Sequence, residues 1–237
     1  MRSRSLRLVN PMLAAIATFF CLTTSSIAGP PLICHAFDIG NAKSLPWVSH
    51  DWNLSGSENY DTHHLANDTL AVLNASQVPL VHMETLRRAT LYARKDPVAA
   101  KQLLLQLVTR AKSTEASSSP DAFALFDAAY LTEVYKQWLG EKGGNPANGL
   151  DGLPWMKQAM QLRPSDPQMA FAAALITLRG PESEHRKYAE IATDGEKNDE
   201  LLSRNLATHF RGAQSETMAE MILQNDSAKS KTKVARQ

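Results

Sequence analysis

The sequence is poor in cysteine and in excess charge. Its 237 residues include two cysteines, and 25 lysines and arginines stand against 24 acidic residues. The patterns C-x-x-C, C-x-x-C-H and H-E-x-x-H are absent, as are a glycine-rich phosphate loop and a nucleophile elbow. Nothing therefore supports covalent haem attachment, a helix-borne zinc site, a phosphate-binding loop or serine-hydrolase chemistry. The balanced charge also disfavours a polyanionic partner, so no nucleic-acid binding is expected.

An uninterrupted membrane-spanning stretch is missing as well. Leu8 to Leu22 is mostly apolar. Asn10-Pro11 interrupts it, however, and a span needs roughly 20 apolar residues. Three arginines precede this stretch, and Ser26-Ile27-Ala28 follows it as a small-x-small cleavage site. We predict that residues 1–28 are an export signal, which makes the protein periplasmic or secreted with no membrane span after cleavage. A retained anchor is the alternative.

Cleavage at this site changes the charge and the thiol content. It leaves 22 basic against 24 acidic residues, because the segment carries three arginines and no acid. It also leaves Cys34 as the one cysteine, so an intramolecular disulfide is not possible. A chain of this length is sufficient for one domain with a proper core, and its stability is expected to come from packing.

Residues 29–60 show no lasting periodicity. Turn-forming residues recur every few positions, which predicts an extended, irregular N-terminal arm. The segment is too apolar for a free linker, so we expect it to dock on the rest of the protein, with Trp47 and Trp52 as candidate staples. Its large apolar residues are Ile33, Phe37, Ile39, Leu45, Trp47 and Trp52.

From Asp61 onward, apolar residues recur at helical spacing. Asp61 or Thr62 is expected to cap a first helix, and Pro79 is expected to open a second. On this second helix Met83, Leu86, Thr90 and Ala93 form the predicted buried face, while Glu84, Arg87, Arg88, Arg94 and Lys95 are predicted to face solvent. Further helices are predicted after Asp96-Pro97, from Pro120 to Leu139, on both sides of Pro164, from Pro181 to Thr193 and from Asp199 to Phe210. Gly140 to Gly152 reads as a flexible loop.

The stretch from Met156 to Gly180 joins two of these helices through a tight turn. Pro164 ends the first helix because proline lacks the N–H that the next turn needs. Asp166 supplies an N-cap carboxylate, and Pro167 stands at the first helical position. Ala159 lies five residues before Pro164, and this junction resembles the one between two tetratricopeptide repeats. The resemblance covers this one junction, with no second copy at the expected period, and it implies a TPR-like scaffold that binds a protein or peptide.

Together these patterns predict an all-α fold of about eight helices. We expect residues 61–225 to form antiparallel hairpins stacked as a short TPR-like α-solenoid, with a closed helical bundle as the alternative. Residues 226–237 are polar and basic, so a disordered tail is expected there.

Two short clusters carry residue types that bind metals. Cys34-His35 stands in the arm, and His63-His64 stands at the start of the first helix. A thiolate and imidazoles suit zinc or copper, so these four residues could form a small metal-binding or redox site, and Cys34 could also act as a nucleophile. The competing interpretation makes Cys34 a small buried residue and places the histidines at turns. Because adjacent residues rarely ligate one ion together, the preferred expectation is no metal and no cofactor.

The preferred hypothesis is an exported, non-catalytic helical-repeat protein that binds a protein or peptide partner. Aromatic side chains in a groove would supply affinity, and charged residues at its rim would supply orientation. The candidate partner-binding residues are Tyr130, Tyr135, Trp138, Arg87 and Arg88. The alternatives are the metal-binding or redox protein described above and an exported enzyme of unrecognised type. The oligomeric state is left open.

Overall fold

The computed structural model of the chain describes residues 32–48, 54, 56–139 and 144–210. In these residues there are eight α-helices, two short 3-10 helices and no β-strand, so the predicted all-α class is confirmed. Within the same ranges, no helix is both long and apolar enough to cross a membrane. The predicted export signal, Trp52 and the predicted tail lie outside the described residues. The stacking of hairpins into a solenoid stays a prediction.

The helices follow one another closely along the chain. They are α1 (Leu65–Ala75), α2 (Pro79–Ala93), α3 (Pro97–Glu115), α4 (Ala122–Leu139), α5 (Leu153–Leu162), α6 (Pro167–Thr177), α7 (Glu182–Gly195) and α8 (Glu200–Phe210). Short 3-10 turns, η1 (Thr62–His64) and η2 (Glu196–Asn198), precede α1 and α8. Asp96 and Asp166 cap α3 and α6, each followed by a proline at the first helical position. Asp61 caps η1, which leads directly into α1.

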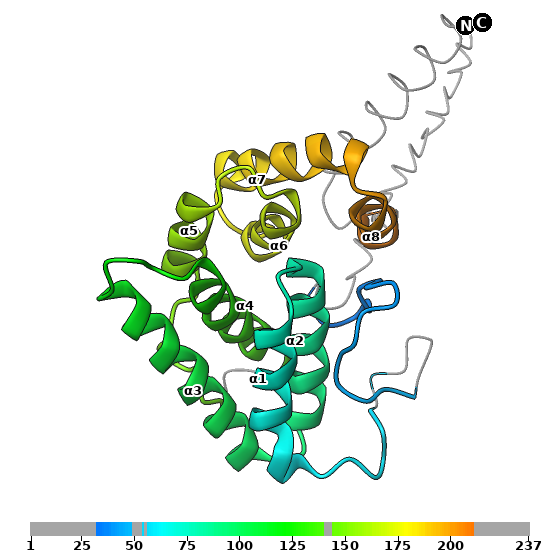
Figure 1. Cartoon of the computed structure of the whole chain (residues 1–237), viewed down its shortest axis with the longest axis vertical. Coiled ribbons are helices and arrows are strands. Elements are labelled where there is room, and N and C mark those ends of the chain that lie inside the picture. The colour runs from blue at the N-terminus through cyan, green and yellow to red at the C-terminus, as the bar shows by residue number, and fades with distance from the viewer. Residues whose placement is uncertain (1–31, 49–53, 55, 140–143, 211–237) are drawn as a thin grey trace, which may run out of the picture.

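The core lies where α4 and α6 meet their neighbours. Consecutive helices pack together in α1 with α2, α3 with α4, α4 with α5 and α6 with α7. α2 also contacts α4 and α6, while α8 packs on α6 and α7 (Figure 1). A run of alanines makes α6 thin enough to be surrounded in this way, because small side chains let other helices approach closely. These fully buried residues are Ala170, Ala172, Ala173 and Ala174.

One face of α2 differs from the prediction. Arg94 and Lys95 are exposed as expected. Glu84, however, is fully buried and Arg87 is only 2% exposed. The reason is that residues 32–47 lie over this face, as the blue segment beside α2 in Figure 1 shows. The helical period identified a face without apolar residues, but it could not show that another segment covers it.

Candidate functional site

Residues 32–47, which we call the arm, lie against helices from both halves of the chain. Its apolar side chains Leu32, Ile33, Phe37, Ile39 and Leu45 are all buried. We call the surface beneath it the arm face. It is formed by Glu84, Arg87, Arg88 and Tyr92 of α2, Tyr130 and Gln137 of α4, Phe171 of α6, and Arg204, Asn205 and His209 of α8.

Three charged side chains of α2 form one network on the arm face. Glu84 accepts hydrogen bonds from Arg87 Nε at 2.7 Å and from Arg88 Nε at 2.6 Å. The two guanidinium carbons lie 5.2 and 5.7 Å from the centre of the Trp47 ring. Burying charges costs several kcal/mol per ion unless each is paired and hydrogen bonded. If the arm face only had to bury the apolar side chains of the arm, it would not need this charged network.

The arm face holds the arm largely by its main chain. Asn205 makes a two-way contact with Asp38, because Oδ1 accepts from the Asp38 amide and Nδ2 donates to the Asp38 carbonyl, both at 2.8 Å. The other contacts join Glu84 to the Phe37 amide (3.0 Å), Arg87 to the Ile33 carbonyl (3.2 Å), Arg88 to the Leu45 carbonyl (2.7 Å) and Gln137 to the Leu32 amide (3.1 Å). Main-chain groups are common to all residues, so these contacts hold the backbone of the arm without selecting its sequence.

Phe37 is a buried aromatic anchor of the arm. Its ring stacks on His209 at 4.4 Å between centroids and 11° between planes. Tyr130 and Phe171 meet it edge-on at 6.5 and 6.0 Å. Burial lowers the pKa of His209 to about 3, so its ring is neutral, and Nδ1 lies 2.9 Å from the Asn205 carbonyl, which it can contact as a donor. Three helices thus supply a slot for one flat ring.

The residue after this anchor points outward and makes a charged contact. Arg204 Nε donates to Asp38 Oδ2 at 2.7 Å, and both side chains are nearly half exposed. A hydrogen bond from the Gly40 amide, followed by the contact with Arg204, lowers the pKa of the Asp38 carboxyl. An exposed pair of this kind contributes about 0–1 kcal/mol, so it guides orientation more than it adds stability.

Tyr92 fixes the chain where the arm ends. Its hydroxyl donates to the Pro46 carbonyl and accepts from the Ser57 amide at 2.8 Å. Gly56 lies directly against this ring, since a Cβ at that position would come within 2.3 Å of it. The ring of Tyr60 also packs against the ring of Tyr92, with 4.3 Å between the two centroids. Tyr92 therefore contacts both the end of the arm and residues that lead to α1.

The sequence-predicted partner-binding residues lie in three different settings. Tyr130 and Tyr135 are fully buried. Tyr130 meets Phe37 of the arm, whereas the Tyr135 hydroxyl donates to the Ala100 carbonyl of α3, so the two rings face different neighbours. Their part in binding a partner stays a prediction. Trp138 is half-buried beneath Arg94, whose guanidinium carbon lies 4.8 Å from the ring centre. Arg87 and Arg88, predicted at a solvated rim, contact the arm instead.

The predicted metal ligands are not brought together. Cys34 is half-buried, and desolvation raises the pKa of its thiol, which favours the protonated form. His35 packs near His209, with ring centroids 5.5 Å apart. His63 and His64 lie on exposed η1, where both face Asp61. Among the described residues, no three His, Cys, Asp or Glu side chains form a group that could hold a metal ion.

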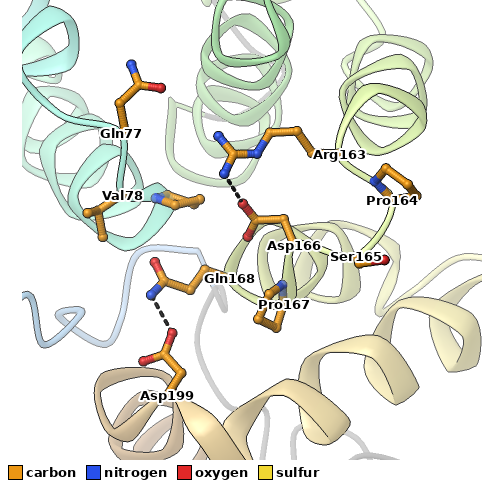
Figure 2. A pocket seen from close by; sticks show the side chains of 10 residues that line it. Gln77, Val78, Arg163, Pro164, Ser165, Asp166, Pro167, Gln168 and Asp199 are labelled. Carbon is orange, nitrogen blue, oxygen red and sulfur yellow. Dashed lines mark hydrogen bonds and ion pairs between the residues drawn. The ribbon is translucent and has the colours of Figure 1, made fainter.

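A separate hollow of about 560 Å³ lies where the turn before α2 meets the starts of α6 and α8. Figure 2 shows that its polar side chains contact one another: Arg163 pairs with Asp166 at 2.9 Å, and Gln168 donates to Asp199 at 2.6 Å. The same Gln168 accepts from the Leu80 amide at 3.2 Å, which caps α2. Asp166 and Asp199 also cap their own helices. The polar groups of this hollow cap helices or pair with one another, so the arm face is the stronger candidate site.

Sequence reasoning missed most of the arm face. The spacing of Glu84, Arg87 and Arg88, at i, i+3 and i+4, indicates that one carboxylate can reach both arginines, but not that the group is buried. For Asn205 and His209 no sequence signal marks a contact with residues more than 160 positions earlier. Comparisons with protein-family models, with curated proteins and with solved structures find no match.

Proposed function

We propose that the protein is an exported, TPR-like binding protein whose arm face holds an extended segment of a partner protein or peptide. In the free protein, its own arm occupies that face. The observation that carries the proposal is the main-chain grip, above all the two-way contact of Asn205 with Asp38. A surface that holds the backbone of one segment can hold the backbone of another.

The charge of the arm face supports exchange of its occupant. Glu84, Arg87 and Arg88 would regain water if the arm left, so the uncovered face would tolerate exposure better than an apolar one. Tyr130 supplies a second argument, because its hydroxyl is buried and has no hydrogen-bond partner among the described residues. An unpaired buried hydroxyl costs about 1–3 kcal/mol. The arm is therefore not a complete complement of the surface that it covers.

The test is a binding titration with a fluorescein-labelled peptide of residues 32–41, with Cys34→Ser to prevent oxidation. The full-length chain with Phe37→Ala has a weakened arm and should bind the peptide in the micromolar range, about −8 kcal/mol. The unaltered chain should bind it at least about tenfold more weakly, because the tethered arm competes at an effective concentration on the order of millimolar. Fluorescence anisotropy measures both affinities.

One result contradicts the proposal. If neither chain binds the peptide and hydrogen exchange shows the Asp38 amide equally protected in both, the arm is a permanent part of the fold.

Export is a separate element of the proposal. N-terminal sequencing of the protein recovered from the periplasm or medium should begin at Gly29, whereas a chain that begins at Met1 would contradict cleavage.

A further inference from the structure

We infer that the arm face selects segments with an apolar residue, three residues of any type, an aromatic residue and then an acidic residue. Ile33, Phe37 and Asp38 are the resident example of this pattern. The inference rests on the proposed function and adds to it the chemistry of the partner.

The aromatic position is defined by the slot around Phe37. His209 offers a parallel ring face at 4.4 Å, and Tyr130 and Phe171 offer edges, so a flat ring fits and a branched aliphatic side chain cannot stack there. The three rings that form the slot come from α4, α6 and α8, and the ring that enters the slot comes from the arm. Loss of this ring from a ligand removes its largest buried contact.

The acidic position follows from the register that Asn205 imposes. Because Asn205 holds both main-chain groups of Asp38, this residue cannot slide along the face. Residues 36–39 lie between two turns, and here the aromatic side chain enters the slot while the next side chain contacts Arg204. Glu200, one turn earlier on α8, orients Arg204, because its Oε1 accepts a hydrogen bond from Arg204 Nη1 at 2.7 Å. An acidic side chain complements the guanidinium, and a lysine opposes it.

The apolar position lies four residues before the aromatic one. The Ile33 carbonyl is held by Arg87, and its side chain is fully buried. This second anchored point fixes the length of segment between the two buried side chains. The arm face therefore selects a segment by the number of residues between its apolar and aromatic side chains, as well as by their residue types.

The experiment uses the full-length Phe37→Ala chain and three labelled peptides of residues 32–41: the parent, Phe37→Ala and Asp38→Lys. We expect the parent peptide to bind more than about tenfold more tightly than the Phe37→Ala peptide and about two- to fivefold more tightly than the Asp38→Lys peptide, because the exposed ion pair contributes little. In a chain that also carries Arg204→Glu, the preference between the parent and Asp38→Lys peptides should reverse. The matched control is Arg186→Glu, which alters another half-exposed arginine paired at i, i+4 with a glutamate, and it should leave the preference unchanged.

The outcomes separate the two proposals. Binding of all three peptides with equal affinity would overturn the selection pattern and leave the peptide site. Binding of none would overturn the site itself. If Phe37→Ala loses its helical circular dichroism, Asp38→Lys serves as the weakened chain, because its side chain lies at the surface. A dimer by light scattering that excludes the peptide would show arm exchange between copies and overturn the partner assignment.

Discussion

His209 illustrates how burial of one ionisable ring makes the arm face sensitive to acid. Burial is the main cause of its low pKa, and the charges of His35 and Arg87 add to it, while the hydrogen bond with the Asn205 carbonyl acts in the raising direction. The pKa is about 3 in the folded protein against an ordinary value of 6.5. Between these values the unfolded chain binds a proton that the folded chain does not. The free energy of unfolding must therefore fall as the pH falls through this range.

The first prediction follows from this sign. His209→Gln should reduce the loss of stability between pH 6.5 and pH 4.5, by up to about 1.4 kcal/mol per pH unit relative to the parent. Urea denaturation at a series of pH values measures the slope. Thr208→Ala, one residue earlier on α8, removes no titratable group, so it is the control and should keep the parental slope. A parental slope in His209→Gln as well would show that this ring is not kept neutral by burial.

His82 presents the opposite case on the far side of α2. Its Nδ1 lies 2.6 Å from Asp127 Oδ1, its Nε2 lies 3.1 Å from the Ser76 carbonyl, and both side chains are buried. Burial lowers the pKa of His82, but the charge and hydrogen bond of Asp127 together with the Ser76 carbonyl outweigh it. Arg110 of α3 acts in the lowering direction. The net direction is upward, which fits an imidazolium that donates from both nitrogens.

A raised histidine pKa contributes stability below the unfolded pKa, and this contribution disappears as pH rises through the folded pKa. We predict that Asp127→Asn costs about 3–5 kcal/mol near pH 6, as for one partner of a buried ion pair, and clearly less near pH 9. Thermal or urea unfolding at the two pH values measures the difference. Asp194→Asn removes an exposed partner of Lys197 and should cost less than about 1 kcal/mol at both. Equal costs for Asp127→Asn at both pH values would mean that His82 is neutral.

At the scale of elements, α8 acts on the arm much as a neighbouring strand would. Asn205 supplies one acceptor and one donor to Asp38, which is the pair that a strand residue would supply. We predict that Asn205→Ala raises hydrogen exchange at the Asp38 amide about 10- to 100-fold, for a loss of roughly 1–3 kcal/mol. Thr208→Ala is the matched control on the same helix, because Thr208 bonds only within α8. Unchanged exchange in Asn205→Ala would show that other contacts alone hold the arm.

Most element starts could be predicted, because the signals that fix them are local. Pro79, Asp96-Pro97 and Asp166-Pro167 each mark a helix start through the chemistry of one or two residues. The environment of Glu84 and Arg87 could not be predicted in the same way. Their charge favours solvent in the absence of a partner, and the arm that buries them lies about 50 residues earlier in the chain. Contacts of this kind depend on tertiary packing, which periodicity does not contain.

At the scale of the whole molecule, the arm connects α2 and α4 to α8. The sequence indicated that residues 29–60 were too apolar to be free, but the face they would cover depends on helices that meet only in the folded chain. α8 packs on α6 and α7, and its inner residues Asn205 and His209 complete their contacts against the arm. The position of α8 is therefore coupled to the arm, which lies more than 160 residues earlier in the chain.

This coupling gives the last prediction. Phe37→Ala should lower the free energy of unfolding by about 3–5 kcal/mol and should raise hydrogen exchange in α8 more than in α3, because His209 of the slot lies on α8 and none of the three slot residues lies on α3. Added peptide of residues 32–41 should restore protection in α8, since it supplies the missing ring to His209. Val48→Ala, at a side chain that is 68% exposed, is the control and should leave both helices unchanged. Equal loss of protection in α3 and α8 would show that Phe37 supports the fold as a whole. If added peptide does not restore the protection of α8, this helix is not part of the binding site.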